Sequence, residues 1–213
     1  MKFKDFVNLY SKYSLVDSRT FSVYSEKPQH LRRQVREWVQ KGYLLPLKRG
    51  LYLFSEDYQR NKISPLFIAN YMCSPSYISL GYALYYYNLI PEKVTVFTSV
   101  TTKKTMVYDN YLARFEYRSI KKDLFFGFKE IKDGDFSIFI SLPEKAILDF
   151  FYFNTDIKRS FDYFDSLRFQ NLEILDINRF NLFQKKYSKR VQRIADLFVD
   201  YVEFYKQKYK ELQ

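Results

Sequence analysis

The side chains best suited to chemistry in this chain are arginines and glutamines between residues 28 and 41. In this segment Leu31, Val35 and Trp38 recur at spacings of four and three residues, which predicts a helix with one apolar, buried face. The opposite face then carries side chains of the types that hydrogen-bond to DNA base edges and phosphates. These are Gln29, Arg33, Arg36 and Gln40, with Arg32 at the border of the face.

A short basic hairpin is predicted directly after this helix, which Gly42 is placed to end. Residues 43–47 and 51–54 are apolar-rich strand candidates on either side of Lys48 and Arg49. A helix followed by such a basic wing is typical of a winged helix-turn-helix, which binds DNA. The helix pattern alone would fit an ordinary amphipathic surface helix equally well. The basic hairpin that follows it is what favours DNA binding. The predicted DNA-binding residues are Gln29, Arg32, Arg33, Arg36, Gln40, Lys48 and Arg49.

The positive charge of the chain is concentrated around this pattern. The net charge of the 213 residues is +11. Residues 1–62 hold 13 Lys and Arg against 6 Asp and Glu, a net charge of +7, whereas residues 63–213 hold 22 against 18, a net charge of +4. The expected partner is therefore a polyanion, with nucleic acid favoured over a membrane surface.

The elements that must position these side chains divide the chain soon after the hairpin. Residues 2–13 and 17–26 are predicted to form two helices ahead of the basic helix. The polar segment 55–65 is the best candidate for a boundary. We therefore expect a winged helix-turn-helix domain at residues 1–62 and a second domain at residues 63–213, each with its own core.

The second domain is expected to combine helices with a small sheet. Predicted helices cover residues 65–72, residues 79–88, a segment that opens at Pro143, and a long amphipathic segment from about 188 to 212. Predicted strands cover residues 93–99, 111–119 and 135–141. The predicted fold class is α+β, with an N-terminal winged helix-turn-helix, a mixed α/β domain with a small sheet, and a helical C-terminal third.

An enzyme is the main alternative to a DNA-binding regulator. His30 and Cys73 are the only histidine and cysteine, so zinc ligation is not supported, and no Walker or dinucleotide-binding glycine pattern occurs. Glu144 and Lys145 follow a predicted strand, as in a nuclease carboxylate–lysine pair, but Asp149 four residues on gives Lys145 a simpler helix ion pair. We expect no catalytic residue, metal or cofactor. A DNA-targeted, nuclease-like enzyme stays open as the alternative.

A second basic cluster lies in the C-terminal third. Its members are Lys185, Lys186, Lys189, Arg190 and Arg193. Such a run is usually a solvated helix face, and a second contact with nucleic acid or with an acidic partner is the alternative.

The cellular location is expected to be the cytoplasm. The N-terminus lacks the apolar region of a signal peptide, and no run of 18 apolar residues occurs. A single cysteine fits a reducing compartment.

Four segments of the chain, taken in order, resemble one known family. They are LRRQVREWVQKGYLLPLKRGLYLF, SYISLGYALYYYNLIPEKVTVFTSVTTKKT, FEYRSIKKDLFFGF and ISLPEKAILDFFYF. The combination resembles the AbiEi-type antitoxins, which are predicted regulators of viral-defence loci. The resemblance covers most of residues 14–155 and weakens beyond about residue 160.

The resemblance implies the antitoxin of a type IV toxin–antitoxin system for abortive phage infection. The partner gene of such a system encodes a nucleotidyltransferase-like toxin, and neutralisation need not involve a stable complex. The family's N-terminal domain represses its own operon at inverted repeats in the promoter, and its C-terminal domain is needed to neutralise the toxin. The positions that match the motif, and so take DNA-contact roles by resemblance, are Arg32, Arg33, Arg36, Lys48 and Arg49.

Overall fold

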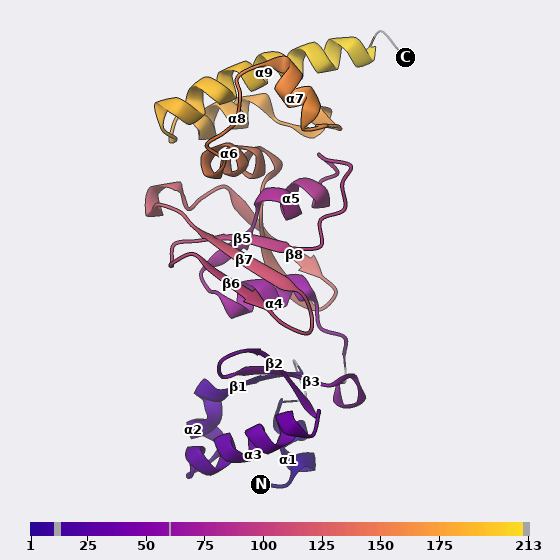
Figure 1. The fold of residues 1–213 in the computed structure, drawn as a ribbon, viewed down its shortest axis with the longest axis vertical. Helices are drawn as coiled ribbons and strands as arrows, with labels where there is room; N and C mark the ends of the chain where they lie inside the picture. The colour runs from indigo at the N-terminus through magenta and orange to yellow at the C-terminus, as the bar shows by residue number, and fades with distance from the viewer. Residues whose placement is uncertain (11–13, 60, 211–213) are drawn as a thin grey trace.

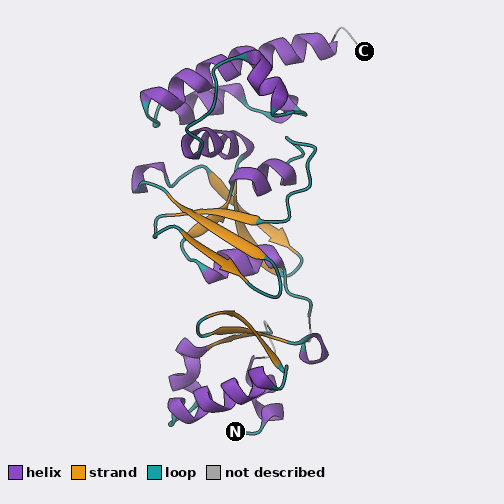
Figure 2. Ribbon diagram, viewed as in Figure 1, coloured by secondary structure: helices purple, strands orange, loops and turns teal. Residues whose placement is uncertain are grey.

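The computed structural model describes residues 1–10, 14–59 and 61–210. Within these ranges the chain is an α+β protein with nine α-helices, a three-stranded antiparallel sheet near the N-terminus, a six-stranded mixed sheet and a helical C-terminal part. Figure 1 shows these parts in sequence along one long axis, with the first helices at one end and the last helices at the other. The larger sheet lies between them (Figure 2).

The N-terminal part packs three helices against one face of the small sheet. Its elements are α1 (Phe3–Tyr10), β1 (Leu15–Asp17), α2 (Phe21–Tyr24), α3 (Pro28–Gln40), β2 (Leu44–Lys48) and β3 (Leu51–Phe54). The strands are antiparallel in the order β1-β3-β2. The predicted basic helix and both strands of the hairpin are confirmed.

Two details of this part differ from the prediction. The helix expected over residues 17–26 is a 3-10 turn, Ser18–Thr20, that continues into the four-residue α2. The Asp17 carboxylate caps this turn by accepting from the Arg19 amide at 2.9 Å. The helix expected over residues 2–13 is α1 at its front, and residues 11–13 lie outside the described residues.

Helix α3 begins and ends as its residues dictate. Pro28 occupies the first turn, where its missing N–H is not needed. Leu31, Val35 and Trp38 are all buried, which confirms the predicted apolar face. Gly42 has φ +75°, and a Cβ there would meet nothing within 4 Å. The left-handed backbone, and not crowding, is therefore what favours glycine after this helix.

The indole of Trp38 lies at the centre of an aromatic core. Its ring centroid is 4.6 Å from that of Phe6 and 5.1 Å from that of Phe3. Only 7% of Trp38 is exposed. Aromatic pairs at these separations contribute about 0.5–1.5 kcal/mol each beyond the burial of their area.

We expect the emission of Trp38 to be blue-shifted and protected from acrylamide in the native protein, because the ring is buried. Since it is the only tryptophan, its emission reports on the N-terminal part alone. A urea titration followed both by this emission and by far-UV circular dichroism checks whether that part unfolds with the rest. An emission typical of water-exposed indole in native buffer would contradict the packing of α3.

The small sheet is covered on both faces. Val16, Leu44 and Phe54 pack with the N-terminal helices. Four leucines of the sheet instead belong to the core of the second part, namely Leu15, Leu47, Leu51 and Leu53. One face of the small sheet therefore packs with the N-terminal helices, and the other is buried against the rest of the chain.

The larger sheet is mixed. Its strands are β4 (Ser76–Ile78), β5 (Phe97–Thr101), β6 (Met106–Asp109), β7 (Arg114–Ser119), β8 (Phe128–Asp133) and β9 (Phe136–Ser141). The order is β6-β7-β5-β4-β9-β8, in which β4–β9 and β5–β7 are the parallel pairs. Helix α4 (Pro65–Met72) lies on the side of the N-terminal part, and α5 (Leu80–Tyr86) lies on the side of the C-terminal helices (Figure 1).

Four helices form the C-terminal part. They are α6 (Pro143–Phe153), α7 (Phe161–Ser166), α8 (Ile177–Gln184) and α9 (Lys189–Lys210). The ring of Phe198 on α9 contacts rings from α6, α7 and α8, such as Phe151 at 5.3 Å and Phe180 at 5.8 Å between centroids. None of the helices in the described ranges is long and apolar enough to cross a membrane.

The predicted elements of the second part are largely present, and the strands account for the differences. The strand expected over residues 93–99 is β5 and begins at Phe97, four residues later. Strands β1, β4, β6 and β8 were not predicted. The first three are only three or four residues long and show little of the alternation that marks a strand.

Candidate nucleic-acid interface

A shallow groove of about 510 Å³ runs between α3 and the turn that joins β2 to β3. The structure brings four of the seven predicted DNA-binding residues together here. They are Gln29, Arg32, Arg36 and Arg49. Ser18 and Tyr52 also line the groove, and neither was predicted from the sequence. The groove therefore combines three guanidinium groups with an amide and two hydroxyls, the donor set that binds phosphates and base edges.

Gly50 holds the hairpin turn against the 3-10 turn Ser18–Thr20. Its carbonyl oxygen accepts from the Ser18 amide at 2.8 Å. A Cβ at Gly50 would lie 2.4 Å from Ser18 Oγ, and φ is +79°. The left-handed backbone favours glycine here, and any larger residue would also force the Ser18 hydroxyl to rotate away. This contact holds the turn that carries Arg49, which lines the groove together with residues of α3.

The arginines of the groove carry charge that nothing nearby neutralises. Arg32, Arg36 and Arg49 are exposed, and none of them forms an ion pair within the described ranges. Among the residues that the structure describes, no acidic side chain lines the groove. Unpaired guanidinium groups in a concave surface raise the local positive potential and attract a polyanion.

Two predicted residues of α3 lie outside this groove. Arg33 Nε lies 3.5 Å from Glu37 Oε1 in an exposed i,i+4 ion pair, so its charge is partly matched. Gln40 is exposed at the last position of the helix and does not line the groove.

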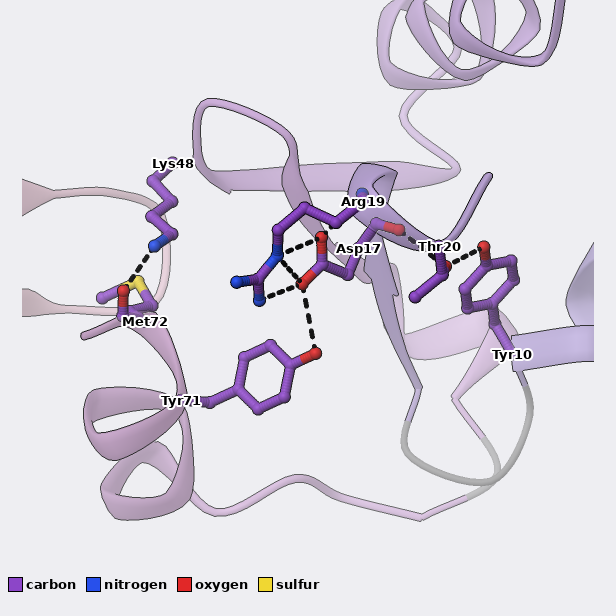
Figure 3. A network of polar contacts seen from close by, with 7 residues as sticks. All are labelled: Tyr10, Asp17, Arg19, Thr20, Lys48, Tyr71 and Met72. Carbon is purple, nitrogen blue, oxygen red and sulfur yellow. Dashed lines mark hydrogen bonds and ion pairs between the residues drawn. The ribbon is translucent and has the colours of Figure 1, made fainter. Parts of the chain in front are cut away.

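Lys48, the remaining predicted DNA-binding residue, does not line this groove. Its ammonium donates to the carbonyl oxygen of Met72 at the end of α4 (Figure 3). It also lies 5.8 Å from the centroid of the Tyr108 ring. Burial, followed by the nearby Arg19 charge, lowers the pKa of Lys48. Lys48 is the last residue of β2 and Arg49 is the first residue of the turn, so the two side chains leave the hairpin differently: Lys48 contacts the second part of the chain, and Arg49 lines the groove.

Further polar contacts tie the N-terminal part to the second part beside Lys48. Tyr71 on α4 donates from its hydroxyl to Asp17 Oδ2 at 3.2 Å (Figure 3). Asn110 Nδ2 donates to the Leu47 carbonyl at 3.0 Å. Burial alone would raise the pKa of Asp17, but the hydrogen bonds from Arg19 and Tyr71 outweigh it and hold this pKa below its usual value. These contacts orient the groove relative to the larger sheet.

A second polar cluster lies in the core of the second part. The ammonium of Lys145 donates to Asp149 Oδ1 and to the hydroxyl of Tyr187. The same carboxylate accepts from Tyr77 at 3.0 Å, from Ser79 at 2.9 Å and from Tyr187 at 2.8 Å. The predicted i,i+4 pair is therefore present, but Lys145 and Asp149 have no exposed surface. Burial lowers the pKa of Lys145, and Asp149 opposes that effect.

The neighbouring Glu144 is also buried and has a structural explanation. Its carboxylate accepts from the Asp176 amide at 2.9 Å and from Arg179 Nε at 3.1 Å. It therefore joins α6 to the start of α8. The groups that resembled a nuclease pair in the sequence are thus enclosed by their own partners and do not reach the surface.

The second basic cluster of the sequence is divided in the structure. Lys186 lies over the ring of Phe126, with its Nζ 4.2 Å from the centroid. Lys185 and Lys189 are exposed and line none of the hollows described here. Arg190 and Arg193 instead line a small hollow on the C-terminal part.

Histidine, cysteine and acidic side chains do not gather into a group of three that could hold a metal ion within the described ranges. Comparison of the sequence with known protein families gave no matching family model, and the curated proteins likewise gave no match.

Proposed function

We propose that this chain is a DNA-binding transcriptional autorepressor whose N-terminal part is a winged helix-turn-helix. Helices α2 and α3 are joined by three residues, which suits a helix-turn-helix pair with α3 as the recognition helix. The β2–β3 hairpin is then the wing. The observation that carries the proposal is the groove, because it places Arg32 and Arg36 of the helix beside Arg49 of the hairpin with no acidic neighbour in its lining.

The antitoxin role rests on the resemblance of residues 14–155 to the AbiEi-type antitoxins. On that basis we propose that the chain acts in the cytoplasm, binds double-stranded DNA at inverted repeats of its own promoter, and counteracts a nucleotidyltransferase-like toxin in abortive phage infection. The second part of the chain is proposed to carry the antitoxin activity. A nuclease-like function is less well supported, because Glu144 and Lys145, the pair that suggested it, are fully buried.

Arg36→Gln is expected to weaken binding to the chain's own upstream region by about 1–3 kcal/mol if the side chain reads a base. If Arg49 contacts a phosphate, Arg49→Gln should reduce the slope of log affinity against log salt by about 0.9. Gel-shift titrations at several salt concentrations measure both quantities. Wild-type affinity for the upstream region no better than for random DNA would overturn the proposal.

Two charge-matched variants serve as controls for this experiment. Lys93→Gln removes one exposed positive charge from the second part and should leave the titration unchanged. Arg33→Gln removes one positive charge from α3 outside the groove, so we expect it to reduce the affinity for the upstream region less than Arg36→Gln does. Equal losses for Arg33→Gln and Arg36→Gln would show that the groove does not define the contact surface.

A further inference from the structure

The C-terminal helices carry a second hollow with concentrated positive charge. It has a volume of about 250 Å³ and lies where the end of α6 meets the start of α9. Its lining residues are Thr155, Ile157, Arg159, Arg190, Arg193 and Ile194. The three arginines come from two segments that are about 30 residues apart in the sequence, so only the fold brings them together. Pockets that enclose drug-sized ligands are usually about 300–1,000 Å³, so this hollow suits a smaller group.

Arg190 is fixed in this hollow by the end of α6. Its Nη2 donates to the carbonyl oxygens of Phe151 at 2.9 Å and Tyr152 at 2.8 Å, and its Nη1 donates to that of Asn154 at 3.2 Å. These bonds satisfy carbonyl groups that the helix leaves without partners at its C-terminus. Arg190 therefore supplies a guanidinium of fixed orientation, with its Nε–H outside these bonds.

Arg159 and Arg193, unlike Arg190, do not cap the end of α6. Both are exposed, and neither forms an ion pair within the described ranges. Asp156, Asp162 and Asp196 each lie three residues in sequence from one of these arginines, and none of the three lines the hollow. Asp156 accepts the hydroxyl hydrogen of Thr155 at 3.2 Å, and Asp196 accepts from Gln184 Nε2 at 3.1 Å. Like charges held together without a counter-ion repel each other, and a bound anion relieves that repulsion.

We propose that this hollow is a phosphate-binding site, in which Arg159 and Arg193 bind the anion and Arg190 orients it. Guanidinium groups match the oxygens of a phosphate in bidentate geometry. The phosphate belongs either to a free nucleotide or to a nucleic-acid backbone, since both present the same group. The site lies at the opposite end of the molecule from α3 (Figure 1) and does not depend on the proposed operator binding.

Isothermal titration calorimetry of the full chain tests this site. Every protein titrated carries Arg32→Gln and Arg36→Gln, which lower the affinity of the N-terminal groove for phosphate. The probes are pyrophosphate, ATP and a single-stranded oligo-dT. Arg159→Gln and Arg193→Gln should each weaken binding about tenfold or more, since a charge-assisted hydrogen bond contributes about 1.5–3 kcal/mol. Lys189→Gln, which removes an exposed charge at the start of the same helix outside the hollow, should leave binding unchanged.

The probes distinguish the two sources of phosphate. Binding of pyrophosphate and ATP without oligo-dT assigns a free nucleotide, and tighter binding of oligo-dT assigns a nucleic-acid backbone. The proposal is overturned if no probe binds at millimolar concentration, or if Lys189→Gln weakens binding as much as Arg193→Gln does. Far-UV circular dichroism of each variant verifies that the helices remain folded, and Arg190 is left intact because it caps α6.

Discussion

Asp149→Asn is expected to lower the free energy of unfolding by about 3–5 kcal/mol. The substitution keeps the shape of the side chain and an oxygen for Tyr77 and Ser79 to donate to. It removes the negative charge, however, and leaves the ammonium of Lys145 buried with only the Tyr187 hydroxyl as a polar partner. A buried charge without its counter-ion costs far more than a lost neutral hydrogen bond. Urea denaturation followed by far-UV circular dichroism measures the change.

A double substitution separates the charge effect from simple loss of packing. Lys145→Met combined with Asp149→Asn removes both charges, so we expect it to recover a large part of the stability that Asp149→Asn loses. Glu92→Gln is the surface control, because its pair with Arg168 at 2.8 Å is exposed and should contribute no more than about 1 kcal/mol. Additive losses in the double variant would contradict the view that the buried pair acts as one unit.

The burial of this pair could have been read from the sequence of α6. The spacing of Lys145 and Asp149 predicted the ion pair but placed it on an ordinary helix surface. Helix α6 is apolar around most of its circumference, and such a helix is usually enclosed by protein. The partners Tyr77, Ser79 and Tyr187, by contrast, come from distant segments, and no local pattern identifies them.

Helix periodicity and turn chemistry predicted four of the residues that line the N-terminal groove. Gln29, Arg32 and Arg36 follow from the 3.6-residue period of α3, and Arg49 follows from its place in the hairpin turn. The sequence did not indicate that Lys48 lies outside the groove, because its partner is a main-chain carbonyl of the second part. Contacts between parts of the chain that are distant in sequence leave no signal in the residues around Lys48.

Two strands of the larger sheet were likewise not predicted, because contacts with distant segments define them. β8 has a charged, half-exposed sequence that the pattern did not mark as a strand, because it lies at the edge of the sheet and pairs only with β9. β4 is only three residues long, yet it lies between β5 and β9 and completes the sheet. Short central strands of this kind are defined by their neighbours more than by their own residues.

If the chain is the repressor and antitoxin proposed above, substituting the arginines of the groove should abolish repression and leave rescue from the toxin intact. The variant carries Arg32→Gln, Arg36→Gln and Arg49→Gln, and each of these side chains is exposed and supports no core. Surface substitutions of this kind usually change stability by no more than about 0.5 kcal/mol each, so the second part should stay folded. If each arginine contributes about 1–3 kcal/mol to operator binding, their joint loss reduces binding to the non-specific level.

A promoter-reporter assay measures repression, and a growth-rescue assay measures antitoxicity. In the rescue assay the genes of this chain and of the proposed toxin are both expressed from foreign promoters. Lys93→Gln is the charge control and should leave both unchanged. The polar contacts of Lys48, Tyr71 and Asn110 are left intact, because they orient the N-terminal part on the rest of the chain. If the triple variant fails to rescue growth at wild-type protein level, antitoxicity must act through the DNA-binding surface, and the assignment of the two activities to two parts of the chain is wrong.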